Sequence, residues 1–181
     1  MNQMNRTRAW IVSLVAMVSC IVFPANADDA GLDEILKRFP ADHLLKLQER
    51  DPDLRTFVAQ HFPKDNASVV RADFNGDGNP DYALLLKNDR TGKTKLVVLL
   101  CSVDAQCRNV YELEQTAYAG SVYLQSVSAG SNVSPSKAVD RKNQPLKLPL
   151  SGIQVNYFEK GTVVLRWNPK RQKIEEVQTA D

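Results

Sequence analysis

The sequence has few of the residues on which most catalytic sites depend. Only 2 of its 181 residues are histidine, only 3 are cysteine, and no Cys-x-x-Cys pair is present. Neither sign of charge dominates, with 23 basic and 21 acidic residues, so the basic stripe typical of nucleic-acid-binding proteins is missing. A composition that is 24% charged and 43% hydrophobic excludes disordered and collagen-like chains. The sequence therefore favours a globular, non-enzymatic protein, although it leaves the enzyme class open.

Motifs that imitate catalytic elements are incomplete. Gly92-Lys93-Thr94 looks like the end of a phosphate-binding loop, but the glycine required earlier is replaced by Lys87. Ser134 and Lys137 have the spacing of a Ser-x-x-Lys motif, but its companion elements are missing. His43 and His61 belong to no matching motif. We therefore identify no catalytic or cofactor-binding residue.

One apolar segment near the N-terminus has the features of a secretory signal peptide. Two arginines precede an apolar run from Ala9 to Phe23, and a small-x-small sequence follows at residues 25–27. The run is shorter than the roughly 20 residues that span a bilayer. We expect residues 1–27 to be removed and the mature protein to be periplasmic or secreted, without a transmembrane segment. A lipoprotein anchored at Cys20 remains the alternative, because the residues before it loosely resemble a lipobox.

Cleavage of this leader changes both the charge balance and the number of cysteines. The leader contains two of the basic residues and no acidic residue, so the mature chain has equal numbers of the two. Cys101 and Cys107 then remain as an even pair, at the end of one expected strand and before the next. In an exported chain such a close pair predicts a structural disulfide.

The mature chain, residues 28–181, is expected to be a single α+β domain. Apolar residues at helical spacing predict a cap of short helices over residues 31–62, one of them through Leu44 and Leu47. From residue 66 to 181 the pattern changes to strands joined by short turns, which predicts an antiparallel meander with the cap on one face. The expected strands are 69–72, 82–87, 95–101, 109–114, 122–127, 153–157, 163–167 and 173–178.

A long connection interrupts the expected sheet at residues 128–151. It is rich in serine, glycine, asparagine and proline, and four basic side chains lie within it. Connections of this length are either functional or disordered more often than short ones. Two interpretations stay open, namely a mobile surface loop and a contact site for another protein or an acidic ligand.

Residues 73–81, Asp-Phe-Asn-Gly-Asp-Gly-Asn-Pro-Asp, have oxygen-bearing side chains at positions 1, 3, 5 and 9. Ca²⁺ in proteins takes six to eight oxygen ligands, and alternate residues of a tight loop can point inward together. Gly78 permits the sharp turn that this requires. The predicted ligands of a structural calcium ion are Asp73, Asn75, Asp77, Asn79 through its carbonyl oxygen, and Asp81. The alternative is a metal-free turn stabilised by its asparagine and aspartate side chains.

This loop is similar to known calcium-binding repeats. It is not an EF-hand, because Leu84 occupies the position of the bidentate glutamate. It resembles the D-x-[DN]-x-D-G-x-x-D loop of FG-GAP and VCBS-type repeats, which lies between two strands. The motif occurs once, so the resemblance does not imply a β-propeller, which needs several blades. With its aromatic terminal hairpin, the chain also resembles uncharacterised secreted bacterial proteins, which implies no activity.

Two classes of function are consistent with these features. The first is a non-enzymatic binding or interaction module of the cell envelope, with an unknown envelope or secreted protein as partner. Its variant is an inhibitor or immunity protein for an envelope-active enzyme. The second is a calcium-dependent hydrolase, for which the sequence offers no nucleophile or acid–base pair.

We expect mass spectrometry of the exported protein to find a mature N-terminus at Asp28. Cleavage after Ala27 is favoured because small residues lie at the exit of the apolar run. An N-terminal peptide that begins at an acylated Cys20 would contradict this prediction and support the lipoprotein.

Overall fold

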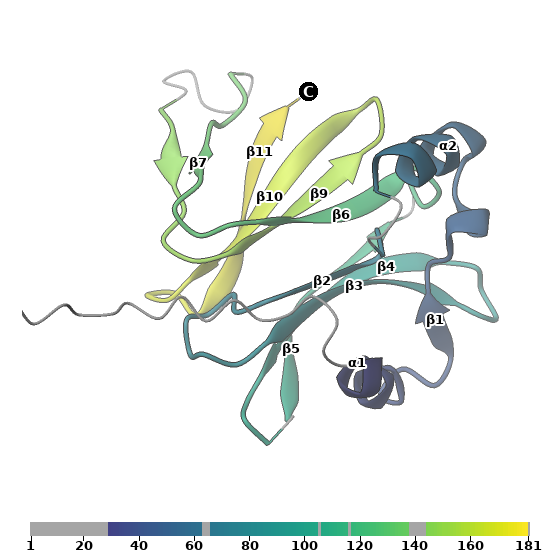
Figure 1. Ribbon diagram of the computed structural model, residues 1–181, viewed down its shortest axis with the longest axis horizontal. Helices are drawn as coiled ribbons and strands as arrows, with labels where there is room; N and C mark the ends of the chain where they lie inside the picture. The colour runs from purple at the N-terminus through teal and green to yellow at the C-terminus, as the bar shows by residue number, and fades with distance from the viewer. Residues whose placement is uncertain (1–28, 63–65, 105, 116, 138–143, 181) are drawn as a thin grey trace, which may run out of the picture.

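Two antiparallel β-sheets face each other across a shared core (Figure 1). The structure is a computed structural model that describes residues 29–62, 66–104, 106–115, 117–137 and 144–180. The predicted leader, residues 1–27, lies outside these ranges. Neither α-helix in the described ranges has the length and apolar character that a membrane crossing requires.

The first sheet has the order β1-β3-β4-β5, with β2 also paired to β3. Its strands are β1 (Asp42–Leu44), β2 (Val69–Ala72), β3 (Asp81–Asn88), β4 (Thr94–Cys101) and β5 (Cys107–Gln115). The central strands β3 and β4 are buried along almost their whole length. Because successive side chains of a strand point to opposite faces, this continuous burial means that both faces of the sheet are covered.

The second sheet has the order β11-β10-β9-β6. Its strands are β6 (Val122–Val127), β9 (Gly152–Tyr157), β10 (Gly161–Asn168) and β11 (Lys173–Ala180), and a separate small pair joins β7 (Asn132–Val133) to β8 (Leu146–Lys147). The inward side chains of this sheet, including Val155 and Trp167, pack against Leu85 and Val98 of the first sheet. These contacts form the main core.

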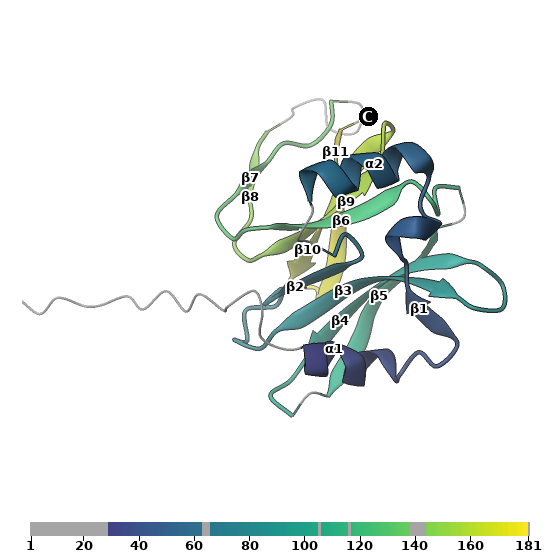
Figure 2. The ribbon, with the colours of Figure 1, turned by 45° about the vertical axis from the view of Figure 1, so that its right-hand side comes forward.

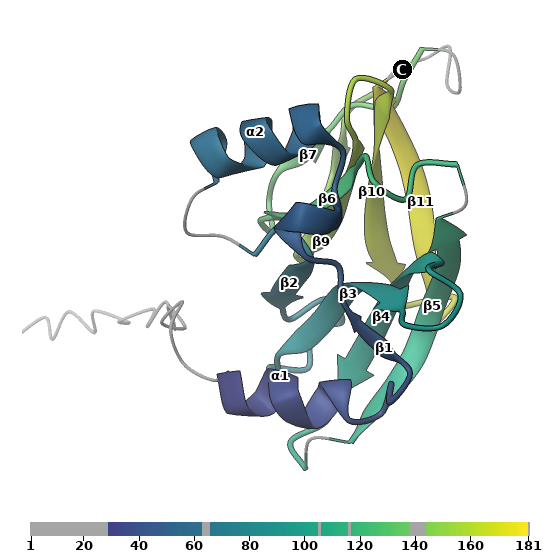
Figure 3. The same ribbon diagram turned by 90° about the vertical axis from the view of Figure 1, so that its right-hand side faces the viewer.

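The helices lie on the outer faces of different sheets (Figures 2 and 3). Ile35 of α1 (Asp29–Leu36) packs on the outer side chains of β3 and β4. Leu54 and Val58 of α2 (Pro52–His61) pack on Tyr123 of β6, and the 3₁₀ turn η1 (Leu47–Glu49) precedes this helix. The β7–β8 pair covers another part of the second sheet through Val133.

Hydrogen bonds join the two sheets at both margins. At one margin the Leu124 N–H donates to the carbonyl oxygen of Ala67, just before β2, at 2.9 Å. At the other, the Tyr111 hydroxyl of β5 donates to Glu176 of β11 at 2.8 Å. The sheets therefore form a sandwich that is tied along both edges.

The predicted α+β fold, with helices on one meander, is wrong. All the expected strands are confirmed, but they form two stacked sheets in a β-rich fold, because β6 pairs with β9 instead of continuing from β5. The helix expected through Leu44 and Leu47 is strand β1 followed by η1, and β1 pairs with β3. Within the long connection at 128–151, the β7–β8 pair was not predicted, since two-residue strands leave no pattern; residues 138–143 lie outside the described ranges.

A charged cluster ties β1 to its neighbours. The His43 ring lies between Glu49, with Nε2 3.0 Å from Oε2, and Asp89, with Nδ1 2.6 Å from Oδ1. Lys87 donates to Glu49 at 3.0 Å. The hydrogen bond to Glu49 raises the pKa of His43 above its ordinary value of 6.5, burial opposes the rise, and the bond to Asp89 adds to it. Burial alone would raise the pKa of Glu49, but hydrogen bonds from the Lys46 N–H, His43 and Lys87 lower it to about 2.

We expect part of the stability of the fold to depend on protonated His43. Because the pKa of His43 is raised in the folded state, its contribution is fully present below 6.5 and is lost as the pH rises through the raised value. Replacing His43 by Gln should lower the free energy of unfolding by up to about 1 kcal/mol near pH 6 and by less near pH 8.5. Urea unfolding of both proteins measures this; an equal difference at the two pH values would contradict a role for the charge.

Candidate metal site in the acidic loop

The acidic loop, residues 73–81, connects β2 to β3 at the end of an antiparallel pair. Ala72 lies opposite Asp81 in the register of the two strands, so the loop closes a hairpin, as expected from the sequence. Gly76 and Gly78 have φ values of 82° and 85°. This left-handed backbone is strained for residues with a Cβ, so the two glycines allow the chain to fold back on itself.

The Asp73 carboxylate organises the first half of the loop. Its Oδ1 accepts from the N–H groups of Gly76 at 2.6 Å and Asp77 at 3.2 Å, and its Oδ2 accepts from the Gly78 N–H at 2.9 Å. Three backbone N–H groups therefore converge on one side chain, which fixes the turn around it.

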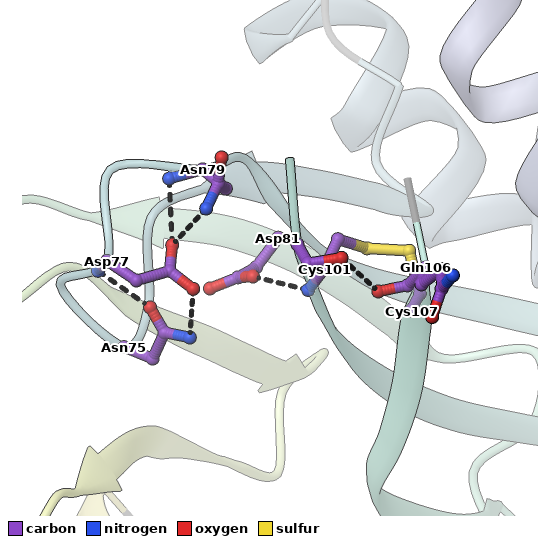
Figure 4. The surroundings of a disulfide bond; sticks show 8 residues. Asn75, Asp77, Asn79, Asp81, Cys101, Gln106 and Cys107 are labelled. Carbon is purple, nitrogen blue, oxygen red and sulfur yellow. Dashed lines mark hydrogen bonds between the residues drawn. A yellow bond between two sulfur atoms is a disulfide. The ribbon is translucent and has the colours of Figure 1, made fainter. Parts of the chain in front are cut away.

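Asp77 lies between two asparagines (Figure 4). Its Oδ2 accepts from the Asn75 side-chain amide at 2.9 Å, and its Oδ1 accepts from the backbone and side chain of Asn79 at 2.8 and 3.0 Å. These bonds, led by the one from Asn75, lower the pKa of Asp77. Asp77 is thus an exposed, ionised carboxylate at neutral pH.

Asp81 is the buried member of the acidic loop. It is 0% exposed, and its two oxygens accept from the N–H groups of Phe74 at 2.8 Å and Cys101 at 2.9 Å. Burial raises the pKa of Asp81 to about 6, the two backbone bonds oppose the rise, and the charges of Asp77 and Asp73 add to it. The three carboxylates are therefore close enough to repel one another, a repulsion that a cation would relieve.

The acidic loop is packed into the rest of the molecule. Phe74 is 1% exposed and belongs to the core between the sheets. Gly76 lies against Leu150, just before β9: a Cβ at this glycine would come within 2.9 Å of Leu150 Cδ2. The loop therefore contacts both sheets.

The remaining acceptor capacity of these side chains suits a hard cation. Each carboxylate oxygen can accept about two hydrogen bonds. Asp73 Oδ2, Asp77 Oδ2 and both oxygens of Asp81 accept only one each in the bonds above, so each has capacity for an ion. However, across the described ranges no group of three or more His, Cys, Asp or Glu side chains stands in a metal-holding arrangement. The donor chemistry fits Ca²⁺, whereas the present spacing of the carboxylates does not by itself form a metal site.

The predicted disulfide is confirmed. Cys101 and Cys107 are bonded, with their Cα atoms 4.0 Å apart, and they face each other at the adjoining ends of β4 and β5 (Figure 4). Because the Cys101 N–H donates to Asp81, the disulfide-closed end of β4 and the acidic loop share a buried contact.

The two histidines have separate surroundings. His43 is held between Glu49 and Asp89, whereas His61 stacks on Phe57 of α2 with ring centroids 4.4 Å apart. The structure therefore does not bring them together. Arg50 is a buried cation beside α2 that the sequence does not reveal, because an arginine flanked by Glu49 and Asp51 has the pattern of a solvated surface charge.

In comparisons with known proteins, no family model matches the chain, and neither a curated protein nor a solved structure matches it significantly. The resemblance to FG-GAP and VCBS-type loops therefore rests on the residues of the acidic loop alone.

We expect Asp81→Asn to destabilise the protein even in the presence of a chelator. An asparagine has one acceptor oxygen, so either the Phe74 or the Cys101 N–H would lose its buried partner, at a cost of about 1–3 kcal/mol. Asp77→Asn is the matched control, because this exposed side chain keeps an oxygen for Asn79 and should change stability by less than about 0.5 kcal/mol. Urea unfolding with EDTA measures both variants, and equal losses would contradict the special role of Asp81.

Proposed function

We propose that this chain is an exported, non-enzymatic module of the cell envelope whose acidic loop binds Ca²⁺ as a structural ion. In this proposal the module acts by contacting another envelope or secreted protein. The observation that carries the calcium assignment is the convergence of Asp73, Asp77 and Asp81 on one glycine-shaped hairpin, with Asp81 buried.

The connections of the acidic loop support a structural role for the ion. Asp81 bonds to the end of β4 beside the disulfide, and Phe74 lies in the core between the sheets. Leu150, which precedes β9 of the second sheet, covers Gly76. An ion that fixes the three carboxylates would therefore restrain both sheets at one point.

The partners of the carboxylates also favour stabilisation over catalysis. All the hydrogen bonds described above for these three side chains come from backbone N–H groups or from asparagine amides. A general acid or base needs a neighbouring group with which it can exchange a proton during a reaction. Groups fixed in a backbone network are better suited to holding an ion.

We expect millimolar Ca²⁺ to raise the melting temperature. Extracellular calcium modules have dissociation constants of about 10⁻⁴ to 10⁻³ M, so roughly 5 mM Ca²⁺ should add about 1–2 kcal/mol. For a domain of this size, that corresponds to a rise of roughly 2–8 °C. Calorimetry of the exported protein with Ca²⁺ and with EDTA measures the shift.

The variants separate a specific site from general ionic effects. Asp77→Ala should abolish the shift, whereas Asp53→Ala removes an exposed acid from α2, on the other sheet, and should retain it. The calcium assignment is wrong if wild type shows no shift or if both variants respond alike.

Pull-down from envelope extract tests the other half of the proposal: a specific protein partner supports it, and turnover of an envelope polymer by the purified protein overturns it.

A further inference from the structure

A cavity of about 360 Å³ lies between η1, α2 and the residues that lead into β2. Six of its nine lining residues are apolar, among them Leu47, Val58 and Phe62. This volume is near the lower end of the range for small-molecule sites, roughly 300–1,000 Å³. A cavity of this size suits a small apolar ligand better than a segment of a folded partner.

Arg50 places a positive charge on the wall of this cavity. The residue is 4% exposed; its Nη2 donates to the Ser68 hydroxyl at 2.5 Å and its Nη1 to the Val122 carbonyl oxygen. Both acceptors are neutral, and no carboxylate of the described residues lies within 4.0 Å of the guanidinium. Burial lowers the pKa of Arg50 to about 10, and the nearby charge of Glu49 opposes the fall, so the guanidinium stays protonated at neutral pH.

A buried cation with no carboxylate of the described residues in direct contact is costly. Desolvation of an ion costs several kcal/mol, and neutral hydrogen-bond acceptors offset only part of this penalty. A guanidinium carries five N–H donors. The bonds to Ser68 and Val122 engage two of them, which leaves donors for an anion that enters the cavity.

We propose that this cavity binds a small amphipathic monocarboxylate, with its carboxylate on Arg50 and its hydrocarbon chain along Leu47, Val58 and Phe62. A single buried cation balances a single negative charge. A phosphate ester carries about −1.5 to −2 charges at neutral pH and would bring excess negative charge into the apolar lining. This site is separate from the acidic loop, so the proposal does not depend on calcium binding.

Isothermal titration calorimetry with octanoate tests this site on the exported protein. We expect saturable one-to-one binding with a dissociation constant below about 1 mM, together with no saturable binding of octanol or acetate in the same range. Octanol retains the chain without the charge, and acetate retains the charge without the chain. The proposal is wrong if octanoate does not bind, or if octanol binds as tightly as octanoate. Neither result depends on a variant.

Variants of α2 locate the site. Ala59 lines the cavity from the exposed side of the helix, so Ala59→Phe should fill it and weaken octanoate binding at least tenfold. Gln60→Phe is the matched control, because Gln60 is the exposed next residue and is not among the lining residues. Arg50→Gln should cause a similar loss while retaining an amide donor for Ser68. Equal octanoate affinity in the two phenylalanine variants would contradict binding in this cavity.

Discussion

The buried carboxylate of Asp81 is the contact on which the arrangement around the acidic loop depends. Its two oxygens hold the start of the loop, at Phe74, and the end of β4, at Cys101. The ring of Phe74 then extends into the core between the sheets, and the disulfide joins Cys101 to β5. Loop, core and strand pairing are therefore coupled through one ionisable side chain.

The two central strands determine the layered architecture. In β3, Leu85 faces the second sheet, whereas Leu84 and Leu86 face α1. A sheet that is apolar on both faces needs a cover on each side. The second sheet supplies one cover and α1 the other, so the fold needs two stacked sheets rather than one meander with a helical cap.

The sequence predicts local structure here better than it predicts pairing. Runs of β-branched and apolar residues located every long strand, and the aspartate spacing located the hairpin loop. The division into two sheets left no such trace, because the choice of β9 rather than β5 as partner for β6 is a tertiary contact. At β1, leucines at helical spacing also fit a three-residue strand followed by a 3₁₀ turn.

For the candidate sites, too, the sequence predicts local patterns better than tertiary contacts. The oxygen-bearing residues of the acidic loop are apparent from their spacing, but the burial of Asp81 depends on the approach of β4. Arg50 has no signal in the sequence, since its burial arises from η1, α2 and β6 meeting around it. Both sites thus depend on burial of a charge, which spacing along the chain does not reveal.

We propose that a cation bound by the acidic loop acts on the core through Asp81. A calcium titration of the exported protein, followed residue by residue through its backbone amide signals in NMR, tests it most directly. We expect the largest shifts within residues 73–81 and at Cys101, whose N–H donates to Asp81. Unchanged signals in the loop, or shifts confined to the loop with Cys101 unaffected, would contradict it.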